Sequence, residues 1–231
     1  MSEKRNAQGQ TLAEFLADYD PNRFDRPSVT VDMAVITDAR EVLLIRRGNH
    51  PNIGRWALPG GFVNMDETLH TAAARELFEE TGIKNAPLVP IGMFGEPTRD
   101  PRTRILTCAF AAKVRREDLT FAAGDDAADA ALFRVSVERQ GRVDIPAPVR
   151  RGYDVTLPCT ACGTPYGASG TAYELRLWGT GSAEGIELCT RVAVDDQGTI
   201  VLLGGIEGKE QPAGDHGLVL FHALHALGMV D

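Results

Sequence analysis

Residues 61–83 read GFVNMDETLHTAAARELFEETGI, and this stretch decides the fold of the region around it. From residue 67 to about residue 81 it contains neither Gly nor Pro, and good helix formers dominate, which predicts an α-helix. Asp66 is the expected N-cap, and Gly82 suits the left-handed position just after the helix. The apolar residues that recur at helical spacing predict a narrow buried stripe; they are Leu69, Ala72, Ala73 and Leu77.

Three glutamates of this expected helix lie on one edge. Glu76, Glu79 and Glu80 stand at positions i, i+3 and i+4, so their carboxylates converge and repel one another. An exposed, solvated acidic face is the ordinary explanation for such a helix. The alternative is that divalent cations such as Mg²⁺ or Mn²⁺ neutralise the carboxylates, because these ions take oxygen ligands and are commonly shared with substrate phosphates. The residues that precede the helix favour bound cations over a solvated acidic face.

The segment before the helix is an apolar strand interrupted by a turn. Residues 56–62 read WALPGGF, and the two glycines lack the Cβ that would keep a ligand away from the backbone. With the helix, this segment resembles a complete Nudix box, G-x5-E-x7-R-E-U-x-E-E-x-G-U, with U an aliphatic residue. The resemblance implies a metal-dependent hydrolase of diphosphates. It implies as metal ligands the Gly60 carbonyl, Glu76, Glu79 and Glu80, as the supporting pair Arg75 and Glu67, and as motif glycines Gly61 and Gly82.

The resemblance extends beyond the box, over about residues 11–135 and again near residue 215. It rests on residues 19–20, 26–32, 46–62, 99–104, 124–126 and 215–216. These are similar to the Nudix branch that contains ADP-ribose pyrophosphatases and transcriptional regulators of NAD metabolism. The branch implies an α/β/α sandwich with a mixed β-sheet, and cleavage of ADP-ribose to AMP and ribose 5-phosphate.

The alternative function is a regulator that binds such a metabolite without strong hydrolysis. In the related regulators a winged-helix domain follows the Nudix part, whereas here little sequence follows Asp215 and His216. A pure binding module would also have no need to keep all three glutamates of the box. We therefore expect an enzyme.

The order of the elements predicts four parts. Residues 1–27 are expected to form a helix, at residues 11–19, and an arm. Residues 28–135 form the Nudix core, residues 136–212 a β-rich insertion, and residues 213–231 a closing C-terminal helix. The core strands are expected at residues 28–37, 41–46, 88–95, 104–114 and 130–135. Further strands are expected in the insertion at residues 153–157, 172–177, 186–194 and 199–203, between Gly-rich turns.

Hydrolysis of a diphosphate needs an activated water and contacts to the phosphates. A metal ion and a carboxylate base would activate the water. The candidates for the base are Glu79 on the helix and Asp125 or Asp126 in a separate loop, although the loop also reads as a plain hairpin turn. Arg47, Arg99 and Arg102 are the expected phosphate contacts, against the alternative that they are ordinary surface arginines.

The composition of the chain limits the classes of partner that it can bind. The formal net charge is −8 and no long cluster of Lys and Arg offsets it, so nucleic acid is a poor partner and a small nucleotide is favoured. The polar N-terminus lacks an apolar signal region, and no apolar run reaches the roughly 18 residues of a membrane span. We therefore expect no membrane partner and a place in the cytoplasm.

Four cysteines are expected to stay reduced. Cys159 and Cys162 have the spacing of half a zinc site, but the other half is not evident, so we expect no zinc. The resemblance further implies a homodimer. The apolar edge of the N-terminal helix, Leu12, Phe15 and Leu16, is its expected interface, although this edge could instead pack on its own sheet.

Overall fold

The structure, a computed structural model, describes residues 3–123, 127–145 and 169–230. Its strands are β1 (Ser28–Thr37), β2 (Glu41–Arg47), β3 (Trp56–Ala57), β4 (Gly60–Phe62), β5 (Val89–Phe94), β6 (Ile105–Val114), β7 (Ala127–Asp144), β8 (Ser169–Gly179), β9 (Glu187–Asp195) and β10 (Ile200–Gly204). Its helices are α1 (Leu12–Asp18), α2 (Leu69–Thr81) and α3 (His216–Ala226), with short 3-10 turns η1 (Arg116–Asp118) and η2 (Gly181–Ala183).

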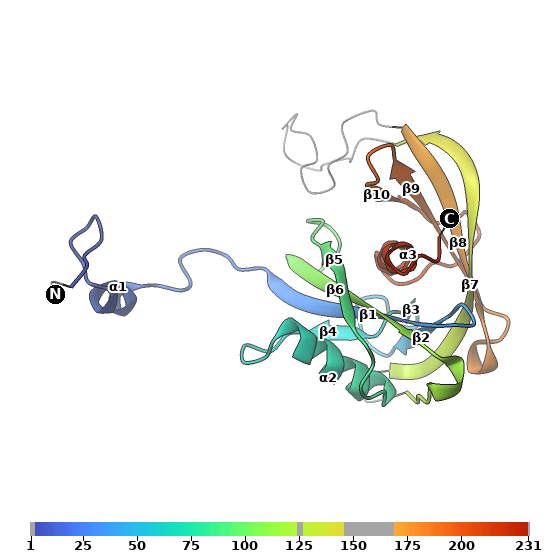
Figure 1. The fold of residues 1–231 in the computed structure, drawn as a ribbon, viewed down its shortest axis with the longest axis horizontal. Coiled ribbons are helices and arrows are strands. Elements are labelled where there is room, and N and C mark those ends of the chain that lie inside the picture. Colours follow the sequence, from blue (N-terminus) through green and yellow to red (C-terminus); the bar gives the residue numbers. More distant parts are fainter. Residues whose placement is uncertain (1–2, 124–126, 146–168, 231) are drawn as a thin grey trace.

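The strands form one sheet in the order β10-β9-β8-β7-β2-β1-β6-β5, with β3 paired to β2 and β4 paired to β1 (Figure 1). β1 and β6 run parallel along their whole length, whereas β1 pairs with β2 and β4 in antiparallel fashion. The sheet is therefore mixed, as expected. The core strands lie close to their predicted positions, and β1 coincides with its predicted range.

Helices cover both faces of the sheet because the side chains of β1 alternate between them. Val31, Met33 and Val35 belong to the apolar cluster that contains the buried residues of α2. Ala34 and Ile36 belong to the cluster on the opposite face, which contains the buried residues of α3. This arrangement confirms the predicted α/β/α sandwich, with a buried core on each side of the central strands.

The structure confirms the predicted C-terminal end of α2 but not its predicted N-cap. Gly82 ends the helix in the left-handed region, at φ 74°, and its N–H donates to the Phe78 carbonyl. The predicted N-cap, Asp66, is wrong: Thr68 takes this position, because its hydroxyl accepts a hydrogen bond from the Thr71 N–H at 3.1 Å. Leu69 lies in the first turn and is 37% exposed, so it does not belong to the buried stripe.

The β-rich segment extends the same sheet. β7 continues well beyond residue 135: its first part pairs with β2 and its second part, from Phe133 to Asp144, pairs with β8. The strands expected at residues 172–177, 186–194 and 199–203 are present as β8, β9 and β10, whereas residues 153–157 lie outside the described part of the chain. β7, β8 and β9 curve around α3, which lies in the concavity (Figure 1).

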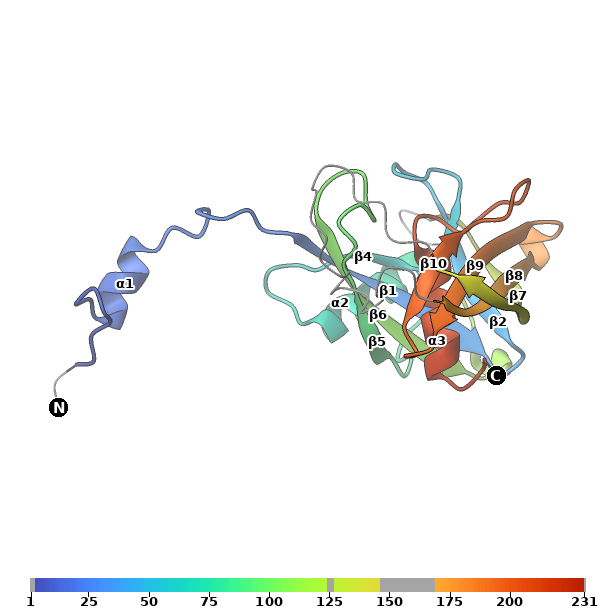
Figure 2. The ribbon, with the colours of Figure 1, turned by 90° about the horizontal axis from the view of Figure 1, so that it is seen from above.

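The N-terminal helix α1 stands apart from the rest of the molecule in both views (Figures 1 and 2). Thr11 and Glu14 form a capping box that stabilises it, but none of its residues is buried. Packing of its apolar edge on its own sheet is therefore wrong for this chain. Among the helices that the structure describes, none is long and apolar enough to cross a bilayer.

Candidate active site

A cavity of about 370 Å³ opens where α2, the turn before it and the N-terminal end of α3 meet. One side is formed by residues of the expected Nudix box, among them Gly60, Gly61, Glu76 and Glu80. The rest of the lining is formed by Asp32 of β1, which pairs with Gly60, and by three loops, residues 47–52, 99–102 and 213–216. The last of these loops belongs to the chain that follows the β-rich segment.

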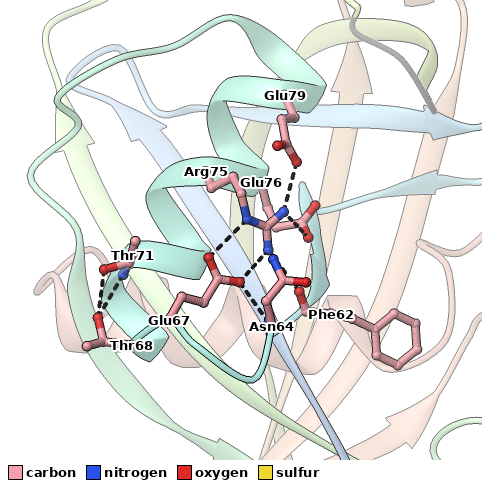
Figure 3. Close-up of polar contacts among 8 residues, drawn as sticks. All are labelled: Phe62, Asn64, Glu67, Thr68, Thr71, Arg75, Glu76 and Glu79. Atoms are coloured by element: carbon pink, nitrogen blue, oxygen red, sulfur yellow. Dashed lines mark hydrogen bonds and ion pairs between the residues drawn. The ribbon is translucent and has the colours of Figure 1, made fainter.

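Arg75 organises the carboxylates of α2 (Figure 3). Its guanidinium donates to both oxygens of Glu67, at 3.0 and 2.6 Å, and to one oxygen each of Glu76 and Glu79, at 2.8 Å. It also donates to the Phe62 carbonyl at 3.0 Å. These bonds hold the pKa of Glu67 down at about 2, so this carboxylate stays ionised. The structure thus places Arg75 and Glu67 together, in the bidentate geometry that orients neighbouring groups.

Glu80 points away from Arg75 and into the protein. It is only 9% exposed, and its Oε2 accepts a hydrogen bond from the Gly60 N–H at 2.7 Å. Burial raises its pKa to about 8, although this hydrogen bond opposes the shift. Burial also raises the pKa of Glu76, against the effect of Arg75. Two carboxylates are therefore held in a place that disfavours their charge, so a cation bound there would stabilise them.

The two glycines before α2 leave no room for side chains. A Cβ on Gly61 would lie 2.3 Å from the Glu76 carboxyl carbon, and one on Gly60 would lie 2.2 Å from the Val31 carbonyl oxygen. Gly61 therefore lets the Glu76 carboxylate lie directly against the backbone of β4. The same absence of a Cβ lets a metal ion approach the backbone at this turn.

The residues present fit a divalent metal ion, although they are not yet arranged as its ligands. Among the described residues, no three His, Cys, Asp or Glu side chains are already grouped as a metal site. Arg75 binds Glu76 and Glu79, and Glu79 is 45% exposed at the outer edge. Glu76, Glu80 and the backbone of Gly60 nevertheless supply oxygen ligands of the kind that Mg²⁺ and Mn²⁺ prefer, and the Glu80 carboxylate is buried.

The three predicted phosphate contacts have different surroundings. Arg47 lines the cavity, and its Nε donates to the Pro51 carbonyl at 2.8 Å. Arg102 is 43% exposed, pairs with Asp100 at 2.8 Å, and lies over the Phe62 ring at 5.3 Å. Arg99 is 7% exposed and is bound by two hydrogen bonds to Asp215, at 2.9 and 2.8 Å. The guanidinium of Arg99 is therefore already bound to a carboxylate of the protein.

Sequence reasoning missed three residues of the cavity lining: Asp32, Asp215 as the partner of Arg99, and His216. The signal for Asp32 was available, because it is the one charged residue within the apolar strand at residues 28–37. The pairing of Arg99 with Asp215 joins residues 116 positions apart and had no local signal.

Some predicted residues lie outside the described part of the chain. Asp125 and Asp126, the alternative bases, are among them, and so are Cys159 and Cys162. These predictions therefore remain predictions. Cys108 and Cys189 are described, and both are buried free thiols.

Comparison with known proteins agrees with this geometry. The sequence profile of the NUDIX domain matches residues 26–146. An ADP-ribose pyrophosphatase of Methanocaldococcus jannaschii is 41% identical over 107 residues, which are 46% of this chain and 62% of the relative. An ADPR-responsive transcriptional repressor, NtrR of Acinetobacter baylyi, is 39% identical over 43% of this chain and 42% of the relative. The chain thus spans less than two thirds of the length of either relative.

Two solved structures resemble the fold. A MutT/nudix family protein from Enterococcus faecalis matches with a TM-score of 0.62 and 26% identity over 95% of this chain and 70% of that chain. The NUDIX domain of Shewanella oneidensis NrtR, solved in complex with ADP ribose, matches with a TM-score of 0.50 and 32% identity over 53% of this chain and 82% of that chain. The first match includes the β-rich segment, so that extension also occurs on a solved Nudix protein. Because the domain profile covers more than half of its residues, the chain belongs to the Nudix family.

Proposed function

We propose that this protein is an Mg²⁺- or Mn²⁺-dependent hydrolase of a nucleoside diphosphate linked to another group, with ADP-ribose as the substrate and AMP and ribose 5-phosphate as the products. The observation that carries the proposal is the pair of carboxylates of buried Glu80 and half-buried Glu76, which lines the cavity beside the Gly60–Gly61 turn. The relatives named for ADP-ribose support the choice of substrate.

We assign the residues of the site to metal binding, positioning, proton transfer and phosphate binding according to where they lie. Glu76, Glu80 and the Gly60 carbonyl would hold the metal, which when bound supplies charge neutralisation at the phosphates and lowers the pKa of water. Arg75 and Glu67 keep the α2 carboxylates in place. Glu79, the most exposed of the three glutamates, would exchange its ion pair with Arg75 for a metal ligand role or accept a proton from water. Arg47 and Arg102 at the cavity are the phosphate contacts we retain.

A substrate panel tests this function. ADP-ribose, dinucleotides, nucleotide sugars and nucleoside triphosphates would be assayed with Mg²⁺, with Mn²⁺ and with a chelator. We expect release of AMP from ADP-ribose with either metal and none with the chelator. Metal-dependent cleavage of only nucleoside triphosphates would contradict the substrate class.

The second candidate, a metabolite-binding regulator, is favoured by the similarity to the ADPR-responsive repressor. The same panel separates the two functions when calorimetry is added to it. Binding of ADP-ribose without turnover, in the presence of either metal, would support the regulator. The net charge of −8 keeps us from proposing direct contact of the described domain with nucleic acid.

We also infer a homodimer in which α1 takes part. Leu12, Phe15 and Leu16 are 68%, 42% and 59% exposed, an unusual amount of apolar surface for a short helix that packs on no other described element of the chain. Phe15→Asp should therefore convert a dimer into a monomer and weaken substrate binding in the same variant. Light scattering at micromolar concentration measures this, with Ala17→Asp, at an exposed position of the same helix, as the control. A fully active wild-type monomer would contradict the inference.

A further inference from the structure

Asp32 is a buried carboxylate to which the mechanism above assigns no role. It lies in β1 opposite Gly60 of β4 and lines the cavity, and its side chain is only 9% exposed. Its Oδ2 is buried without a hydrogen-bond partner, and the nearest cationic group, Arg99 Nη2, is 3.5 Å away. An acceptor left in this state costs free energy unless a ligand or water donates to it.

His216 presents a donor to the same part of the cavity. Its Nδ1 accepts a hydrogen bond from the Leu58 N–H at 2.9 Å, so in the neutral ring Nε2 carries the proton. Nε2 lies 3.9 Å from Asp32 Oδ1, too far for a direct hydrogen bond. Asp32 Oδ2 lies toward Arg99, so Oδ1 is the oxygen beside His216, and the Nε2 donor and the Oδ1 acceptor lie side by side at the cavity without a hydrogen bond between them.

Hydrogen bonds anchor His216 and the segment that leads into it, and Asp32 lies in the central strand β1. The Ala213 N–H donates to the Trp56 carbonyl at 2.8 Å, and Asp215 is locked by the two hydrogen bonds from Arg99. With the Leu58 bond, these contacts attach the start of α3 to the strand and turn that lead into the Nudix box. The gap between Asp32 and His216 is thus a built feature of the fold.

The chemistry of the gap selects its ligand. A phosphate oxygen accepts hydrogen bonds but cannot donate to Asp32, and its charge is repelled by this carboxylate. An ammonium group donates but leaves the His216 N–H without an acceptor. A hydroxyl both accepts and donates, so one hydroxyl, or the two of a vicinal diol, satisfies both residues. We propose that Asp32 and His216 form a subsite for a sugar hydroxyl of the substrate, an inference that rests on the proposed function.

Two variants test the subsite without removing its supports. Asp32→Asn keeps the size of the side chain but removes its charge. His216→Asn keeps an acceptor near the position of Nδ1 for the Leu58 N–H, and removes the donor at Nε2. Asp38→Asn, just after the far end of β1 and outside the cavity, is the matched control.

The substrates are ADP-ribose and analogues that each lack one hydroxyl, either on the adenosine ribose or on the terminal ribose. We expect each subsite variant to lower kcat/KM for ADP-ribose about 10–100-fold, as for loss of a hydrogen bond to a charged group. For one deoxy analogue, wild type and variants should have nearly equal kcat/KM, because the bond is already absent. The control should behave as wild type with every substrate.

The outcomes separate this inference from the proposed function. Equal losses by the variants on all substrates, or no loss at all, would overturn the subsite while the hydrolase remains. If the wild type binds ADP-ribose without hydrolysis, the same variants and analogues are compared by their Kd, measured by calorimetry. The subsite is then supported or overturned by the same pattern of losses in Kd. A wild type that neither hydrolyses nor binds any of these compounds overturns both.

Discussion

Glu80→Gln should reduce hydrolysis of the substrate by about 1000-fold with the fold intact. The change removes the charge of one proposed metal ligand at nearly constant volume, and the glutamine oxygen can still accept the hydrogen bond from the Gly60 N–H. A catalytic metal supplies several kcal/mol of transition-state stabilisation, and each 1.4 kcal/mol is a factor of ten in rate. Steady-state kinetics at saturating Mg²⁺ measure the effect. A variant that keeps more than a tenth of the wild-type rate would end the metal role of Glu80.

The pH dependence of stability, measured without metal on the wild type and on Glu80→Gln, provides the control for this variant. The unfolded chain ionises Glu80 near its usual pKa of 4.5, whereas burial raises the pKa in the folded protein to about 8. The folded state therefore favours the protonated form, so wild-type stability should fall as the pH rises from 4.5 to 8, and the glutamine variant should lack this component. Thermal denaturation in a chelator should show a Tm difference that opens over this pH range. Added Mg²⁺ should stabilise the wild type more than the variant.

Arg99→Met should destabilise the protein by about 3–5 kcal/mol, the usual cost of removing one partner from a buried ion pair. The Arg99 side chain is 7% exposed, and its loss leaves Asp215 and Asp32 without their cation in a buried place. For a chain of this size the expected fall in Tm is roughly 10 °C. Chemical denaturation monitored by circular dichroism measures the free energy of unfolding.

Arg102→Met is the matched comparison, since Arg102 is 43% exposed and its pair with Asp100 is worth little to stability. We expect Arg102→Met to raise KM with stability nearly unchanged, and Arg99→Met to lower stability first. If instead Arg99→Met were as stable as the wild type and only KM rose, Arg99 would be the phosphate contact that the sequence suggested.

The parts of the site that the sequence predicted well are local. α2 and the turn before it are specified by helix formers, by Gly82 at a left-handed φ and by two glycines whose Cβ positions are filled. β1 was located to the residue, because it is rich in β-branched residues and is bounded by Pro27 and by the turn at residues 38–40. The N-cap was missed by two residues, since Asp66 and Thr68 are both good caps and only the hydrogen bond of Thr68 decides between them.

The rest of the cavity lining, which includes Asp32, Asp215 and His216, could not be predicted in the same way, because its position depends on long-range contacts. Asp32 comes to the cavity through the pairing of β1 with β4, and Asp215 and His216 come through the path of β7, β8, β9 and β10 around α3. A sequence pattern indicates that a strand exists, but the partner of that strand is set by the sheet as a whole. The surroundings of Arg99 could not be predicted for this reason, because its partner Asp215 lies 116 positions later in the chain.

The late position of residues 213–216 has a consequence for how the protein matures on the ribosome. The Nudix box is synthesised early, but the wall of the cavity that carries Asp215 and His216 is made only after β10. At roughly 5–20 residues per second, this leaves an interval on the order of ten seconds in which the acidic helix exists and the cavity has one open side. The residues of the proposed metal site are therefore synthesised well before those that complete the wall of the cavity.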